Sequence, residues 1–100
     1  MTKFVSVLAP EAEDDVSNAF LWYRHRNALA ADAFRTEVFE TIERIGDAPL
    51  GRAPDVNGNR NRVLKHFPYT VWYEVQNQIV TILAVAHHRR RPNYWRDIKR

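Results

Sequence analysis

The chain has 100 residues, of which 45% are hydrophobic and 27% are charged. A chain of this length buries about two-thirds of its unfolded surface in one compact unit, so we expect a single domain over residues 1–100. The absence of cysteine excludes disulfides and thiolate metal sites and fits a reducing cytoplasm. No apolar run approaches the ~20 residues of a membrane span, and the N-terminus lacks a signal-peptide pattern. We therefore expect a cytoplasmic protein without membrane association.

Charge is distributed unevenly along the chain. Residues 1–58 carry six basic and ten acidic side chains, a net charge of −4, whereas residues 59–100 carry nine basic and two acidic ones, a net charge of +7. A small domain with such a gradient is expected to have a basic face, which attracts phosphate groups or acidic protein segments. The simpler alternative is a surface of uneven charge with no such partner.

The N-terminal half predicts a strand followed by a helical hairpin. Residues 5–8 form a β-type run, and the acidic segment after Pro10 is typical of a helix start, because proline and carboxylates suit the first turn. We expect a break near Asn27, a second helix that ends near Ile45, and Gly46 as its left-handed cap. Two helices joined so closely form an antiparallel hairpin. Apolar stripes at helical spacing mark the two inner faces, and they are Ala12, Val16, Ala19, Phe20 and Tyr23, then Phe34, Val38, Thr41, Ile42 and Ile45.

The C-terminal half has the pattern of a β-meander. A loop rich in proline, glycine and asparagine covers residues 47–61, and strand-like runs follow at residues 62–67, 69–75 and 79–86. Because their connections are only a few residues long, neighbouring strands must be antiparallel. The last run is almost wholly apolar, which places it in the sheet interior. We expect an α+β fold, with the N-terminal strand and the antiparallel helical hairpin packed on a twisted antiparallel sheet that has a C-terminal three-stranded meander.

Most common catalytic chemistries lack their residues in this chain. The adjacent His87 and His88 point to opposite faces of a strand, and no carboxylate stands at ligand spacing from them, so we expect no metal site. The serines Ser6 and Ser17 are not in a nucleophile elbow. Three scattered glycines do not make a phosphate-binding loop, and no cofactor is expected.

Basic and aromatic residues gather instead in the last 40 residues or so of the sequence. Cationic side chains neutralise phosphates, and aromatic rings stack on unpaired bases. The same residue types also support metal-free RNA cleavage, in which a base takes the 2′-hydroxyl proton and cations stabilise the transition state. Alternatively, the tryptophans belong to the core and the arginines to a solvated rim. The residues in question are Arg62, Lys65, His66, Tyr69, Trp72, Tyr73, residues 87–91, Tyr94 and Trp95.

Two stretches in this half carry a resemblance to a known family. Residues 62–75 comprise a basic strand, a turn at Pro68 and an aromatic strand, and residues 79–95 comprise an apolar strand that runs into a basic tail. In order and spacing they resemble the RelE/ParE superfamily, the toxins of bacterial type II toxin–antitoxin modules. The resemblance extends to the first strand and both helices, so it covers almost the whole chain. It implies a helical hairpin on a twisted antiparallel sheet and a cognate antitoxin that masks the basic face.

Two mechanisms divide that superfamily. RelE-like members cleave mRNA in the ribosomal A site, and for them the resemblance implies Arg62 and Lys65 as phosphate contacts, Arg90 as the cation for the transition state and Tyr94 as acid or base. ParE-like members poison DNA gyrase and are not themselves enzymes. The long hairpin with its acidic first helix and the ending at residues 92–95 are more ParE-like. RelE-like nucleases are richer in strand lysines than this chain, so we favour the gyrase poison.

The expected partners follow from these alternatives. They are a cognate antitoxin, acidic where it contacts residues 59–100, and DNA gyrase, or else the ribosome and its mRNA. A third hypothesis, from another class, is a basic nucleic-acid-binding module without a toxin role, whose binding weakens steeply with salt. The remaining candidates form a basic and aromatic face for the target or the antitoxin, and they are His66, Tyr73, His87, Arg89, Arg91 and Trp95.

Overall fold

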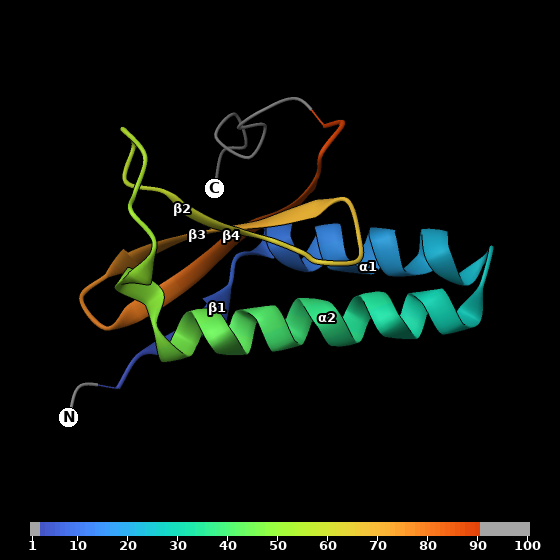
Figure 1. The fold of residues 1–100 in the computed structure, drawn as a ribbon, viewed down its shortest axis with the longest axis horizontal. Helices are drawn as coiled ribbons and strands as arrows, with labels where there is room; N and C mark the ends of the chain where they lie inside the picture. Colours follow the sequence, from blue (N-terminus) through green and yellow to red (C-terminus); the bar gives the residue numbers. More distant parts are fainter. Residues whose placement is uncertain (1–2, 91–100) are drawn as a thin grey trace.

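The computed structural model describes residues 3–90 as two layers, a four-stranded sheet with two long antiparallel helices across one of its faces (Figure 1). This is the predicted α+β fold. In chain order the elements are β1 (Val5–Leu8), α1 (Pro10–Arg24), α2 (Ala28–Asp47), the short 3₁₀ helix Pro49–Gly51, β2 (Arg60–Val63), β3 (Tyr69–Gln76) and β4 (Ile79–His87). Within residues 3–90, neither helix has the length and apolar character needed to cross a bilayer.

The strand order is β1-β4-β3-β2. β2, β3 and β4 form the expected antiparallel meander, and β4 lies in the interior of the sheet as its apolar run predicts. β1 pairs with β4 in parallel, with Val5 opposite Ile79 and Leu8 opposite Ile82, so the sheet is mixed rather than wholly antiparallel. A tight turn requires the two strands that it joins to be antiparallel. The segment between β1 and β4 is long enough to allow either direction, so tertiary packing determines that these two strands run parallel.

The main core lies between the hairpin and the sheet. The predicted inner faces of both helices are buried, apart from Phe20 and Tyr23, which are half-buried. At the hairpin end, Tyr23, Phe34, Phe67 and Tyr69 form a cluster of rings whose centroids lie 5.0–6.4 Å apart. Aromatic pairs at these distances contribute stabilising free energy in addition to that gained from the apolar area that they bury. The cluster therefore ties both helices to the turn before β3.

The end of α2 differs from the expectation. The helix continues to Asp47, and Gly46 lies inside it, whereas among residues 3–90 the glycine with a left-handed backbone is Gly58, at φ 81°. A β-carbon at position 46 would lie 3.2 Å from the Ser6 hydroxyl. Gly46 thus allows α2 to approach β1 closely. Its position near the end of the helix made it look like a helix cap in the sequence, but its role is in packing.

The first strand of the meander is also displaced from its predicted position. β2 covers Arg60–Val63 rather than residues 62–67. The backbone N–H groups of Lys65 and His66 donate to the Glu37 carboxylate on α2 instead of to a neighbouring strand. The strand therefore ends where a carboxylate on α2 replaces the neighbouring strand as the acceptor. The strand propensity of residues 62–67 does not reveal this acceptor.

The face of the sheet away from the helices carries a second, smaller core. Trp72 is half-buried and packs on Leu83, Ala84 and Ala86, which are 8% exposed or less. A register shift between Trp72 and Tyr73 leaves Leu83 as an extra residue in β4, in the manner of a β-bulge. Trp72 therefore belongs to a core cluster, as one of the two sequence-based alternatives supposed.

The edge of β4 has two different neighbours along its length. β1 ends at Leu8, opposite Ile82, and the last backbone contact on that side is from the Ala9 N–H to the Ile82 carbonyl at 2.9 Å. Beyond that point α1 takes the place of the strand, and its Asp15 Oδ2 accepts the Val85 N–H at 3.0 Å. The carboxylate satisfies a buried donor that a longer β1 would have paired.

Replacing Asp15 with alanine is expected to lower the free energy of unfolding by about 1–3 kcal/mol, because the Val85 N–H loses its acceptor. Urea unfolding at neutral pH measures the change. Asp14→Ala is the matched control, since it removes a carboxylate from an exposed position of the same helical turn. Equal stability of the two variants would contradict a structural role for the Asp15–Val85 bond.

Candidate functional site

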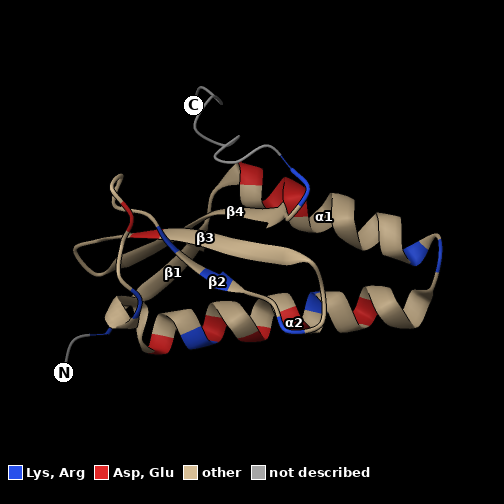
Figure 2. Cartoon of the chain, turned by 45° about the horizontal axis from the view of Figure 1, so that its top comes forward, with Lys and Arg blue, Asp and Glu red and all other residues tan. Residues whose placement is uncertain are grey.

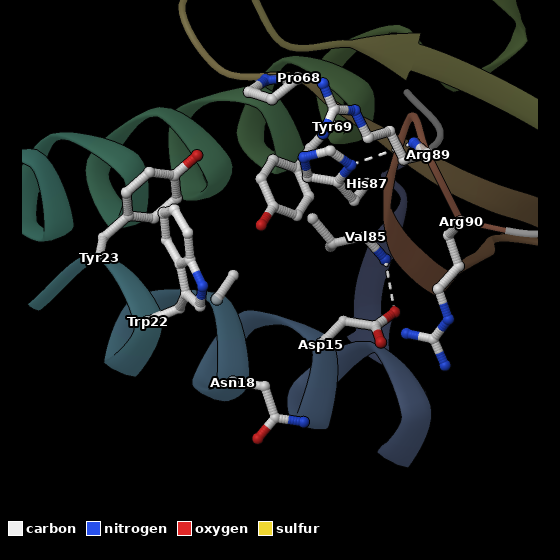
Figure 3. A pocket seen from close by; sticks show the side chains of 11 residues that line it. Asp15, Asn18, Trp22, Tyr23, Pro68, Tyr69, Val85, His87, Arg89 and Arg90 are labelled. Atoms are coloured by element: carbon white, nitrogen blue, oxygen red, sulfur yellow. Dashed lines mark hydrogen bonds between the residues drawn. The ribbon is translucent and has the colours of Figure 1, made fainter. Parts of the chain in front are cut away.

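A groove of about 690 Å³ lies between α1 and the C-terminal end of the sheet (Figure 3). We call it the α1–β4 groove. One wall comes from α1 and consists of Asp15, Asn18, Ala19, Trp22 and Tyr23. The other wall comes from the start of β3, from β4 and from the turn after it, and consists of Pro68, Tyr69, Val85, His87, Arg89 and Arg90.

The floor of the groove is aromatic and uncharged. Burial raises the pKa of Tyr69 to about 12, and the neighbouring Tyr23 and the Asp15 charge act in the same direction. Burial also raises the pKa of Tyr23, although its hydrogen bond with Tyr69 opposes the shift. Both phenols are therefore protonated at neutral pH, and the groove offers rings and hydroxyls rather than negative charge at its base.

His87 is oriented by its neighbours. Its ring packs edge-on against Tyr69, with centroids 5.0 Å apart and planes at 84°. Its Nδ1 accepts the backbone N–H of Arg89 at 3.0 Å. In the neutral ring the proton consequently resides on Nε2, which makes that atom a donor. The adjacent His88 faces Thr70 instead, with its Nε2 3.0 Å from Thr70 Oγ1.

Trp22 forms an exposed aromatic rim of the groove. It is 52% exposed, and its ring stands edge-on to Tyr23 at 5.1 Å. The Arg26 guanidinium lies 3.8 Å from the ring centroid and donates to the Trp22 carbonyl at 2.9 Å. A cation held over an indole face is a favourable arrangement, so the ring is fixed in place although solvent reaches it.

The two walls of the groove have opposite charge. Acidic side chains lie on the first half of α1, and basic ones follow the end of β4 directly across from them (Figure 2). Arg89 and Arg90 line the groove on the β4 side, and Asp15 lines it on the α1 side. In the part of the chain that the structure describes, no group of three or more His, Cys, Asp or Glu side chains is arranged to hold a metal ion.

Residues 7–92 match the family model described as ParE toxin of type II toxin-antitoxin system, parDE. The chain belongs to the ParE toxin family. The resemblance inferred from the order of its strands and helices is therefore confirmed.

Individual relatives agree with the family match. Toxin ParE2 from two strains of Mycobacterium tuberculosis, CDC 1551 / Oshkosh and ATCC 25618 / H37Rv, is 32% identical to this ParE-family chain over 82 residues, which cover 81% of this chain and 78% of the relative. A chain of the structure titled "Chromosomal ParDE TA system from P. aeruginosa" superposes with a TM-score of 0.75 at 17% identity, over 85% of this chain and 96% of that one. At that identity the similarity concerns the fold.

The residues suggested for a RelE-like site are not all brought together in this ParE-family chain. Arg62 lies on β2 opposite Val71, hence on the helix side of the sheet edge, with its Nε buried and without an acceptor among the described residues. Lys65 lies in the turn held by α2. Arg90 lines the α1–β4 groove, with β3 between it and β2. Tyr94 is outside the described residues.

The residues suggested for a binding face are also divided. Tyr73 is fully buried, and its hydroxyl donates to the Pro49 carbonyl at 3.2 Å, so it is a core residue and not part of a face. Alternation along β3 places Tyr73 on the same face as Val71 and Val75, which packs under the helices. His87 and Arg89 meet in the α1–β4 groove, whereas His66 lies against α2. Arg91 and Trp95 are outside the described residues.

Sequence reasoning missed the α1 side of the site. The sequence patterns assign no role to Trp22, and they count Asp15 only among the acidic residues that follow Pro10. Helical spacing did carry a signal, because Asp15, Asn18 and Trp22 recur at three and four residues and so share one face of α1. That face is polar and aromatic, which distinguishes it from the apolar stripe beside it.

Glu37 positions the turn that holds Lys65 and His66. Its carboxylate accepts both backbone N–H groups and lies 2.9 Å from His66 Nδ1, while its side chain is 13% exposed. Burial raises the pKa of Glu37, but the hydrogen bonds from the His66 ring and the two backbone N–H groups outweigh burial and lower the pKa overall. The ionised carboxylate therefore favours the folded state.

Glu37→Gln is expected to reduce the free energy of unfolding by about 1–3 kcal/mol at neutral pH. Because the folded pKa of Glu37 is depressed, its contribution is fully present above the unfolded pKa and is lost as the pH falls through the folded pKa. The stability difference between wild type and variant should thus shrink below about pH 4 in urea unfolding curves. Glu40→Gln, at an exposed position of α2, is the control. A difference that persists unchanged at pH 3 would contradict this role.

Proposed function

We propose that this chain inhibits bacterial growth by poisoning DNA gyrase in the cytoplasm, and that a cognate antitoxin neutralises it by binding over its basic and aromatic residues. Membership of the ParE toxin family supports the proposal. The relatives named above are described as a ParE2 toxin and as a ParDE toxin–antitoxin system, and both descriptions fit a chain that acts through protein partners.

The observation that carries the choice of gyrase is the dispersal of the described cations. Cleavage of RNA without a metal requires an acid, a base and stabilising cations within hydrogen-bond reach of one phosphate. The strand β3 separates β2, with Arg62, from β4, and two strand spacings amount to about 10 Å. Lys65 lies in a turn against α2 and Arg90 lies at the α1–β4 groove. This arrangement favours a toxin that binds its target over one that cleaves RNA.

The exposed candidates suit contact with a protein. His66 is 76% exposed, and Arg89 is exposed at the end of β4. Basic groups at such positions speed association with an acidic partner and determine which partner is accepted. We therefore retain His66, His87 and Arg89 as part of the face for the target or the antitoxin, and Arg91 and Trp95 remain candidates from the sequence alone.

In the decisive experiment, the purified chain is incubated with gyrase, ATP and relaxed plasmid DNA, and the topology of the plasmid is measured. Supercoiling is expected to fall, and linear plasmid is expected to appear after protein denaturation, because a gyrase poison traps the cleaved complex. Ribosome-bound mRNA should remain intact in a parallel translation reaction. Shortened mRNA with unimpaired supercoiling would establish the ribosome-dependent endoribonuclease instead.

A pair of variants separates the same alternatives in cells. Arg62→Ala and Tyr94→Phe should both retain toxicity on induced expression if the chain poisons gyrase, since neither residue then takes part in chemistry. Circular dichroism of the purified variants controls for folding. Loss of toxicity in two folded variants would contradict the proposal.

A further inference from the structure

The face of the sheet away from the helices, which we call the outer face, is largely apolar. Val71, Tyr73 and Val80 point toward the helices, so the residues next to them on each strand point to the outer face. These include the small core around Trp72. Four aliphatic side chains of the outer face are 45–59% exposed, and they are Val5, Val7, Val63 and Ile79. Exposed apolar residues gathered on one face are typical of a surface on which another segment or molecule packs.

We propose that residues 91–100, which we call the C-terminal segment, fold back over the outer face and pack their aromatic side chains on Trp72. The segment lies outside the described residues, but its composition suits the role, because Tyr94, Trp95 and Ile98 supply apolar surface. The partner of the outer face is thus the continuation of the same chain. This arrangement does not depend on which target the protein binds.

The chain turns back at the end of β4. The Arg90 N–H donates to the His87 carbonyl at 2.9 Å, which closes a β-turn, and such a turn reverses the direction of the chain. Both edges of β4 are already occupied there, by β3 on one side and by Asp15 of α1 on the other. The helical hairpin covers the opposite face of the sheet (Figure 1). A segment that continues back along β4 therefore meets the outer face.

The C-terminal segment has the length and the order of residues that this path requires. Its ten residues span up to about 33 Å when extended, and the nine residues of β4 span about 30 Å. Counted back from the turn, Tyr94 and Trp95 come level with residues 82–83 of β4. Trp72 pairs with the next residue, Ala84. The rings of the segment thus reach Trp72, and aromatic pairs contribute stabilising free energy in addition to the apolar area that they bury.

The charges of the two surfaces are complementary. Within the four strands, the outer face carries one charged side chain, the half-buried Glu74. Counted in the same way, Arg96 comes level with Thr81, which is the strand partner of Glu74. The C-terminal segment has four basic side chains and one acidic one. A carboxylate that meets a guanidinium forms charge-assisted hydrogen bonds, so this pair would fix the register of the segment on the sheet.

A tethered segment is favoured over a separate molecule as the cover of the outer face. A stable dimer through this face would bury about 800 Å² of each chain. The C-terminal segment is joined directly to the turn after β4, and a short tether gives an effective concentration in the millimolar range, so the segment occupies the face first. Pro92 has no backbone N–H for a ladder, which suits a layer held by side chains rather than a fifth strand.

The arrangement separates the roles of the residues in the segment. Arg91 stays beside the α1–β4 groove, because it follows the turn directly, whereas Trp95 becomes a packing residue. The last two cations, Lys99 and Arg100, come level with the turn between β3 and β4, at the other end of the sheet. They therefore do not act together with Arg89 at the groove.

A double-mutant cycle in the full chain, measured by urea unfolding, tests the contact. Trp95→Ala is expected to raise the equilibrium constant of unfolding about tenfold in the wild-type background but only about twofold in the Trp72→Ala background, since the aromatic pair is already lost there. The matched control is Trp22→Ala, which removes the tryptophan at the rim of the α1–β4 groove. In that background the effect of Trp95→Ala should remain about tenfold.

Two results of the cycle would overturn the proposal. One is an equal effect of Trp95→Ala in the wild-type and Trp72→Ala backgrounds, which would show that the two rings do not interact. The other is an effect of Trp95→Ala that disappears in the Trp22→Ala background, which would place the C-terminal segment along the α1–β4 groove.

NMR of the wild-type chain gives an answer even if Trp72→Ala does not fold. Nuclear Overhauser cross-peaks are expected between the Trp95 indole and the Leu83 methyl groups. Isotope-filtered spectra of mixed labelled and unlabelled chains show whether both groups belong to one chain. Cross-peaks that arise only between chains would assign the outer face to a second copy, and a lack of Trp95–Leu83 cross-peaks would leave it uncovered, so either result overturns the proposal. Intramolecular cross-peaks in a chain that fails to poison gyrase would refute the proposed function alone.

Discussion

The shortness of β1 determines how the rest of this molecule is arranged. The strand stops at Leu8, opposite Ile82, and the second half of β4 is left without a strand on that side. α1 occupies the vacant edge, and its Asp15 carboxylate accepts the Val85 N–H that would otherwise be buried and unpaired. A helix is wider than a strand, so where α1 takes the place of β1 along β4 a groove opens that a longer β1 would have closed. The candidate site is thus a consequence of the way the sheet edge is completed.

Aromatic packing keeps that groove open and in a fixed shape. The rings of Tyr23, Phe34, Phe67 and Tyr69 lie between the hairpin and the start of β3, and Trp22 and His87 extend this cluster to the surface. Rings packed edge-on or tilted against one another have already lost most of their conformational freedom. Since the phenols of Tyr23 and Tyr69 are neutral at physiological pH, the charged groups of the site are those of its two walls. Recognition can therefore combine an apolar anchor in the middle with ion pairs at the rim.

The folded chain distributes its basic residues more widely than the linear sequence indicates. Residues 59–100 form one cationic block along the chain, but within the described part of that block, residues 59–90, the cations of β2, of the turn before β3 and of the segment after β4 lie apart from one another (Figure 2). Each of these segments has its own acidic neighbour or backbone acceptor. The Lys65 backbone N–H donates to Glu37, the Arg60 guanidinium donates to the Arg52 carbonyl at 2.7 Å, and Arg89 stands across the groove from α1. For residues 59–90, cations that are close in sequence are thus not gathered on one part of the folded chain.

The sequence by itself determined the α+β class, the helical hairpin with its break at Asn27, the antiparallel meander and the family. These features depend on local periodicity, on the Asn27 side chain that caps α2 and on the order of the elements, all of which are written along the chain. Tertiary structure alone decided the parallel direction of β1, the packing role of Gly46 and the pairing of Asp15 with β4. Each of these depends on a contact between residues far apart in sequence, and neither propensity nor periodicity contains information about which distant group fills a given position. His87 and Arg89, which the sequence analysis grouped together, do line one groove, whereas the opposite wall with Trp22 became visible only in the folded chain.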